Sequence, residues 1–155
     1  MFTVDHQSRM NKGATILIVE DEPLVRELLC EVIQLFQPTW RIYEAKNGRE
    51  GLEIAQAKRP DLIMLDFHMP VMNGYQLVMA LQQKPETSTI PFILCTSEEP
   101  THPLVRRLSA LGQAVLFKPF ALGEVERSLA QVKFVQPAMD FNRCPSNELA
   151  LFEVA

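Results

Sequence analysis

The sequence has no long hydrophobic run and no paired cysteines, and both absences narrow the class of protein it encodes. No apolar run approaches the roughly 20 residues that a membrane-spanning helix needs. The polar start lacks the apolar core of a signal peptide. The three cysteines are odd in number and widely spaced, which indicates neither a disulfide framework nor a metal-binding pair. We therefore expect a cytoplasmic protein that does not insert into a membrane.

The sequence also lacks a surplus of positive charge and the glycine-rich loops that bind nucleotides. Its 15 Lys and Arg residues are outnumbered by 19 Asp and Glu residues, so direct binding to nucleic acid is not expected. Neither GxGxxG nor GxxxxGK[ST] follows the first apolar segment, which argues against a nucleotide-binding domain. What the chain does have is 155 residues, 47% of them hydrophobic, enough for one globular domain with a core.

Short apolar segments alternate with amphipathic ones along most of the chain. The apolar runs are typical of strands buried in a parallel sheet, and apolar residues spaced three or four apart are typical of helices. Strands are predicted at 14–19, 40–45, 61–65, 90–95 and 114–117, and helices at 23–36, 49–58, 74–84, 103–111 and 121–135. This alternation predicts a doubly wound, flavodoxin-like α/β fold with helices on both faces of a five-stranded parallel sheet, in strand order 2-1-3-4-5.

The chain divides into three parts by composition. We expect residues 1–13 to form a flexible leader, residues 14–134 the domain, and residues 135–155 a tail too short to be an output domain. The tail contains two prolines and an apolar, acidic end. It is expected either to be a loosely attached extension or to dock on the domain or on a partner through its apolar residues, which are Leu149, Leu151, Phe152 and Val154.

Polar residues end four of the five predicted strands, and the carboxyl ends of parallel strands meet at one edge of a sheet, where ligands bind. These residues are Glu20 and Asp21 after the first strand, Asp66 after the third, Thr96 after the fourth and Lys118 after the fifth. Neighbouring carboxylates repel one another unless one is protonated or a cation binds, and carboxylate oxygens suit Mg²⁺. A carboxylate is also a nucleophile toward phosphorus, while an ammonium and a hydroxyl can bind phosphoryl oxygens. The pattern indicates phosphoryl chemistry on a carboxylate.

Four segments of the chain, in this order, resemble the receiver domain of two-component response regulators. They are ILIVEDEP, DLIMLDFHMPVMNG, LCTS and FKPF, and the resemblance covers about residues 14–134. It implies that Asp66 is the phosphorylated residue. It also implies that Glu20, Asp21, Asp66 and the backbone carbonyl of His68 bind Mg²⁺.

The same resemblance implies roles for residues in the later segments. Thr96 would be the switch hydroxyl, with the neighbouring Ser97 as the alternative, and Lys118 the phosphate-binding lysine. Pro70 and Gly74 would shape the loop after the aspartate. Pro119 would follow a cis peptide bond, which is essentially a feature of X-Pro pairs.

One position departs from the family pattern. Receivers usually carry a Tyr or Phe three residues before the lysine, and its rotamer reports phosphorylation; here that residue is Val115. Phe117 has the same strand parity and is the alternative ring, although it lies nearer the lysine. Both residues are expected on an output face made by the fourth helix, the fifth strand and the fifth helix.

The leading hypothesis is a stand-alone receiver. It would accept a phosphoryl group on Asp66 from a sensor histidine kinase or phosphotransfer protein, with Mg²⁺, and signal by altered binding to a downstream protein. It would catalyse only its own phosphorylation and dephosphorylation, and it could pair with a second copy through the output face. The side chain of His68 is either without a role or a modulator of the phosphate lifetime.

Two other functions fit parts of the pattern. A receiver-like interaction module that is never phosphorylated is favoured by Val115 and opposed by the complete set of acidic, hydroxyl and lysine residues. A phosphatase of the haloacid dehalogenase type also uses a strand-end aspartate and Mg²⁺. It requires a second acid two residues later, where this sequence has His68.

Overall fold

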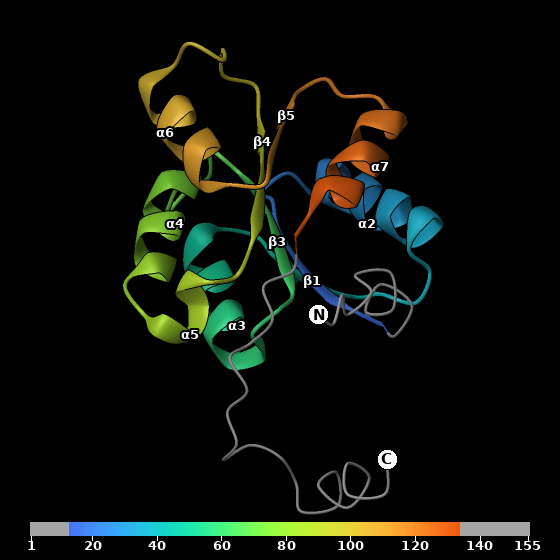
Figure 1. Cartoon of the computed structure of the whole chain (residues 1–155), viewed down its shortest axis with the longest axis horizontal. Helices are drawn as coiled ribbons and strands as arrows, with labels where there is room; N and C mark the ends of the chain where they lie inside the picture. Colours follow the sequence, from blue (N-terminus) through green and yellow to red (C-terminus); the bar gives the residue numbers. More distant parts are fainter. Residues whose placement is uncertain (1–12, 134–155) are drawn as a thin grey trace, which may run out of the picture.

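Five parallel strands form the centre of the computed structural model, which describes residues 13–133 (Figure 1). They are β1 (Thr15–Val19), β2 (Arg41–Ala45), β3 (Leu62–Asp66), β4 (Phe92–Thr96) and β5 (Ala114–Phe117). Their order is β2-β1-β3-β4-β5, which confirms the predicted topology. β1, β3 and β4 lie inside the sheet, and nearly all of their residues are buried, as expected for their continuous apolar sequences.

Helices cover both faces of this sheet (Figure 1). They are α2 (Pro23–Phe36), α3 (Gly48–Lys58), α4 (Gly74–Gln82), α5 (Pro85–Ser88), α6 (Pro103–Leu111) and α7 (Leu122–Gln131). α2 and α7 contact each other on one face, whereas α3, α4 and α6 cover the other. No helix in residues 13–133 is both long and apolar enough to cross a membrane.

Side chains alternate between the two faces of the sheet and build two separate cores. In β1, Ile16 and Ile18 pack toward α2 and α7, while Leu17 and Val19 pack toward α3 and α4. This period of two is the geometry of any strand, and both sets must be apolar because both faces are covered. The sheet is thus held rigidly between two layers, and the carboxyl ends of its strands form one edge.

The prediction of five helices was one short. The additional helix, α5, is a single turn that begins at Pro85, and its buried Thr87 hydroxyl donates a hydrogen bond to the carbonyl oxygen of Leu81 (2.7 Å). A single turn is too short to show the apolar repeat by which longer helices are recognised.

Several predicted boundaries were also displaced. β3 includes Asp66 instead of ending before it, and β4 begins at Phe92, two residues later than predicted. α7 ends at Gln131, whereas the predicted helix continued to residue 135. The prediction was therefore wrong for residues 132 and 133, and residues 134 and 135 lie outside the described part of the chain. The expected leader and tail, residues 1–13 and 135–155, lie almost wholly outside it as well.

The start of α4 is built to lie directly beside the end of β3. The side chain of Asn73 accepts a hydrogen bond from the backbone N–H of Gln76, whose side chain accepts one from the backbone N–H of Asn73. Gly74 lies so close to β3 that a Cβ atom would be 2.3 Å from the carbonyl oxygen of Asp66. Only glycine fits here, and the close approach holds the loop that follows Asp66.

Candidate functional site

Three carboxylates meet at the carboxyl ends of β1 and β3. Glu20 and Asp21 follow β1, and Asp66 is the last residue of β3. Each residue offers a carboxylate oxygen within 4.8 Å of the other two. Because β1 and β3 are neighbours in the sheet, residues more than 40 positions apart in the chain come together. A cluster of hard oxygen donors of this kind suits Mg²⁺ or another divalent cation.

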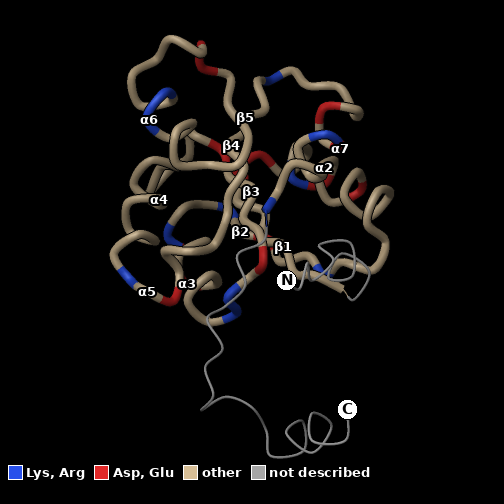
Figure 2. Tube along the Cα trace, viewed as in Figure 1, with Lys and Arg blue, Asp and Glu red and all other residues tan. Residues whose placement is uncertain are grey.

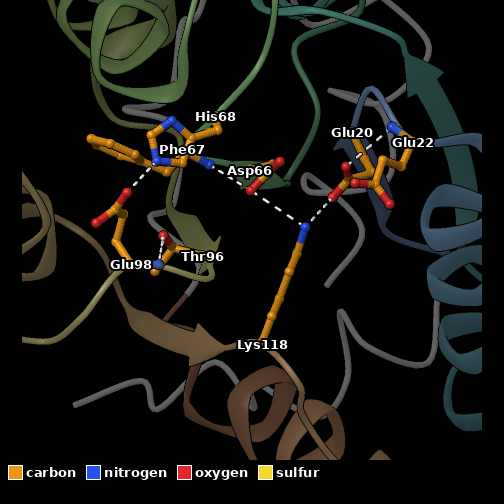
Figure 3. Close-up of polar contacts among 8 residues, drawn as sticks. All are labelled: Glu20, Glu22, Asp66, Phe67, His68, Thr96, Glu98 and Lys118. Carbon is orange, nitrogen blue, oxygen red and sulfur yellow. Dashed lines mark hydrogen bonds and ion pairs between the residues drawn. The ribbon is translucent and has the colours of Figure 1, made fainter.

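Lys118 reaches this cluster from the end of β5 (Figure 3). Its Nζ lies 2.9 Å from Oε2 of Glu20 and 3.4 Å from Oδ1 of Asp66. The ammonium therefore bridges two carboxylates that lie at the ends of different strands. The peptide bond between Lys118 and Pro119 is cis.

Burial governs the electrostatics of the cluster. Glu20 is only 1% exposed, and the loss of hydration raises its pKa to about 7, despite the hydrogen bond from Lys118. Burial also raises the pKa of Asp66, again against the opposing effect of Lys118. For Lys118, burial disfavours the charged form, but the hydrogen bond to Glu20 and the charge of Asp66 outweigh it and raise its pKa. The lysine is thus held as a cation between two acids that are costly to ionise.

The two oxygens of Asp66 have different surroundings. Oδ1 accepts a hydrogen bond from the backbone N–H of Phe67 (2.8 Å) and also faces Lys118. Oδ2 accepts no hydrogen bond from the described residues. The carboxylate is therefore anchored through one oxygen, which leaves the other available for chemistry.

A second group of polar side chains lies on the other side of Asp66, between the loops after β3 and β4 (Figure 3). Thr96 is fully buried, and its hydroxyl oxygen accepts a hydrogen bond from the backbone N–H of Glu98 (3.0 Å). The carboxylate of Glu98 contacts Nε2 of His68, whose ring packs edge-on against Phe67. His68 thus joins the two loops through its side chain, and Thr96 lies beside Asp66 on the neighbouring strand.

The predicted output residues lie on β5. Val115 is half-buried and packs with the core on the α4 and α6 face, whereas Phe117 is 38% exposed. Phe117 is paired with Thr96 in the register of β4 and β5, and Val115 is paired with Leu94. Of the two residues, Phe117 is therefore the one paired with Thr96 and the more exposed.

The structure also shows residues that the sequence patterns missed. The backbone N–H of Phe67 anchors Asp66, the backbone N–H of Glu22 donates to Oε1 of Glu20 (3.2 Å), and Glu98 ties Thr96 to His68. Backbone donors carry no residue signature, which explains the first two. Glu98 lies two residues after Thr96 in an acidic pair, but no sequence pattern connects it to His68.

The response regulator receiver domain family matches residues 16–130, which cover all but the first residue of the sheet and all but the last residue of the helices. The chain belongs to this family. Its members are signalling domains of two-component systems, and this receiver has the CheY-like fold that the sequence predicted.

Solved structures of receivers agree with this placement. The chemotaxis response regulator CheY4 of Vibrio cholerae matches with a TM-score of 0.70 and 28% identity, over 78% of this receiver and 99% of that chain. The receiver domain of the histidine kinase PA1611 of Pseudomonas aeruginosa matches with a TM-score of 0.68 and 26% identity, over 77% and 96%. In that structure a magnesium ion is coordinated in the active site cleft.

Sequence relatives include longer proteins. The sensor histidine kinase TmoS of Ectopseudomonas mendocina is 31% identical over 140 residues, 88% of this receiver but 14% of the kinase. The chain spans less than half the length of that kinase, of the transcriptional regulatory protein TcrX of Mycobacterium tuberculosis and of the response regulator NarL of Escherichia coli. Receivers thus occur both within kinases and within response regulators.

Proposed function

We propose that this receiver accepts a phosphoryl group on Asp66 in a Mg²⁺-dependent reaction and signals through altered protein binding. The observation that carries the proposal is the convergence of Glu20, Asp21, Asp66 and Lys118 at one edge of the sheet. Three carboxylates and one ammonium are the groups needed to bind a divalent cation and a phosphoryl group together.

The oxygen donors fit Mg²⁺, which would be held by Glu20, Asp21 and Asp66, with the carbonyl of His68 as a further ligand by analogy with the family. When bound, the ion supplies positive charge against the phosphoryl oxygens. No softer nitrogen or sulfur ligand belongs to this cluster among residues 13–133.

The residues of the chain would perform the remaining parts of the transfer, which are attack on phosphorus, orientation of the carboxylate and neutralisation of charge. A free carboxylate oxygen of Asp66 attacks phosphorus, and the bond between phosphorus and the donor breaks, with the electron pair leaving on the donor. For a phosphohistidine donor whose other ring nitrogen carries a proton, this returns a neutral imidazole. The N–H of Phe67 fixes the orientation of the carboxylate. Lys118 would neutralise a phosphoryl oxygen, and the hydroxyl of Thr96 would donate a hydrogen bond to another.

The partners follow from this chemistry. The phosphoryl donor would be a histidine kinase or a phosphotransfer protein of the cytoplasm, and the output would be a downstream protein that contacts the surface around Val115 and Phe117. Enzymatic activity would be limited to the gain and loss of the receiver's own phosphoryl group.

The test is incubation of the full chain with acetyl phosphate and Mg²⁺, followed by intact mass measurement. We expect a mass gain of one phosphoryl group, which is absent in Asp66→Asn and after chelation with EDTA. The control is Asp61→Asn, an acidic residue at the opposite end of β3 that binds Thr15. No mass gain in the unaltered protein would contradict the proposal and favour a receiver-like module that is never phosphorylated.

A further inference from the structure

A groove runs along the open edge of β5. It has a volume of about 270 Å³ and is lined by all four residues of β5 and by Glu124, Arg127, Ser128 and Gln131 of α7. β5 is the last strand of the sheet and pairs only with β4, so in the described part of the chain no strand covers its other side. An open strand edge beside a groove favours the binding of a further chain segment.

The lining of this β5 groove combines apolar surface with one positive charge that has no partner in the described part of the chain. Phe117 and Val115 supply the apolar part. Arg127 is exposed and makes no ion pair or hydrogen bond with residues 13–133. Glu124, the one acid in the lining, accepts a hydrogen bond from the backbone N–H of Ala121 (2.6 Å), so its charge is held at the start of α7. The groove is therefore suited to a segment that is apolar and acidic.

The chain itself supplies such a segment. The backbone N–H of Lys133 donates a hydrogen bond to Oε1 of Gln113 (3.3 Å), the residue just before β5. The described part of the chain therefore ends beside the start of β5, at one end of the groove. Residues 147–155 read NELALFEVA and contain two acidic and six apolar residues. The intervening 13 residues, 134–146, span up to about 45 Å when extended, far more than the roughly 13 Å length of β5.

We propose that residues 147–155 dock in the β5 groove of their own chain. Their apolar side chains would cover Val115 and Phe117, and Glu148 or Glu153 would pair with Arg127. A tethered segment of this kind meets its site at an effective concentration on the order of 1 mM, so an intrinsic affinity of about 0.1 mM keeps the groove roughly 90% covered. A downstream protein must then displace this segment, which weakens its apparent affinity about tenfold. The docking does not depend on phosphorylation, so it can be tested separately from the proposed function.

Hydrogen exchange of the full-length protein tests the docking. The double variant Leu151→Asp/Phe152→Asp changes no residue of the described sheet and helices, and it should remove the apolar contact while the domain stays folded. We expect backbone exchange in the peptide covering β5 to become about tenfold faster, with no change in the peptide covering β2 at the opposite edge. The matched control is Met139→Asp/Phe141→Asp, which makes the same kind of change in the tail outside the docking segment and should leave β5 protected.

The charge pair is tested by reversal. Arg127→Glu should deprotect β5, and Glu148→Arg/Glu153→Arg in the same chain should restore protection; Arg49→Glu on α3 is the control. Unchanged exchange of β5 in the Leu151→Asp/Phe152→Asp variant would overturn the proposal. Protection that rises with protein concentration, together with a dimer mass in light scattering, would overturn it in favour of docking between two copies.

Discussion

Glu20 is almost completely buried and lies beside two other acids, with Lys118 as the cation in direct contact. Burial raises the pKa of Glu20 to about 7 and that of Asp66 in the same direction. At neutral pH the folded protein therefore binds protons that the unfolded chain has released. At the residue scale, the carboxylate cluster is a region of unfavourable electrostatics that a cation relieves.

The first prediction concerns stability against pH in the absence of divalent cations. The folded-state pKa of Glu20 lies above its unfolded value of 4.5, so the folded state binds more protons between these values and its stability falls as pH rises through about 7. In EDTA, we expect the free energy of unfolding to be about 1 kcal/mol larger at pH 6 than at pH 8, measured by urea denaturation. Glu20→Gln should reduce this difference strongly, and a Glu20→Gln variant with the same difference would contradict the assignment.

The second prediction concerns Lys118, which occupies oxygens of both Glu20 and Asp66. In Lys118→Met, these oxygens lose their cation, so we expect Mg²⁺ to bind more tightly while phosphorylation by acetyl phosphate slows at least about tenfold. Isothermal titration and intact mass give the two values. Lys58→Met, which removes a lysine that lies over the Tyr43 ring, is the control and should change neither. Slower phosphorylation with weaker Mg²⁺ binding would indicate a purely structural role for Lys118.

At the element scale, the site depends on where strands end and helices begin. The strand-end positions of Glu20, Asp66, Thr96 and Lys118 follow from apolar runs that stop abruptly, and these stops were visible in the sequence. The contact between the start of α4 and the end of β3 was not visible in the sequence, because it depends on how closely two backbone segments approach each other. α5 was missed for a related reason, since one helical turn carries no periodic pattern.

The third prediction tests the contact at Gly74. In Gly74→Ala the new Cβ would lie 2.3 Å from the carbonyl oxygen of Asp66, so the helix or the strand end must move. We expect a loss of about 3 kcal/mol in the free energy of unfolding, measured in urea. The control is Gly123→Ala in α7, where the nearest atom is 3.6 Å away and the better helix propensity of alanine should stabilise the protein by up to about 1 kcal/mol. Equal effects at the two positions would contradict this account.

At the scale of the whole molecule, one sheet separates two cores that share no side chains. Leu129 of α7 belongs to one core and Leu77 of α4 to the other, and both are fully buried. The strands between them carry side chains into both cores, so the two layers depend on the same sheet. The two layers of helices hold the ends of the strands in fixed positions (Figure 1). Fixed positions are needed because the site combines residues at the ends of β1, β3, β4 and β5.

The fourth prediction follows from the two cores. Leu77→Ala and Leu129→Ala should each cost about 2–5 kcal/mol of the free energy of unfolding. The double variant should show the sum of the two costs within about 0.5 kcal/mol, because the side chains lie on opposite faces of the sheet. Urea unfolding followed by fluorescence and by circular dichroism should give one common transition. Separate transitions would show that the two layers unfold independently.

Charge is distributed unevenly on this scaffold. Acidic and basic residues are spread over the helices, while acids gather at the strand ends (Figure 2). With a net charge of −4, the chain is mildly acidic as a whole, so the local cluster and not the overall charge favours cation binding.

The sequence alone determined the fold class, the strand order and the set of strand-end residues, because buried strands, helix repeats and abrupt polar stops are local patterns. It also indicated receiver chemistry, because four short segments carry the family's residues in order. Only the tertiary structure decided which oxygens Lys118 contacts, that Glu98 joins Thr96 to His68, and that Phe117 is more exposed than Val115. These depend on distances between segments far apart in the chain and on the register between strands, which no local pattern specifies.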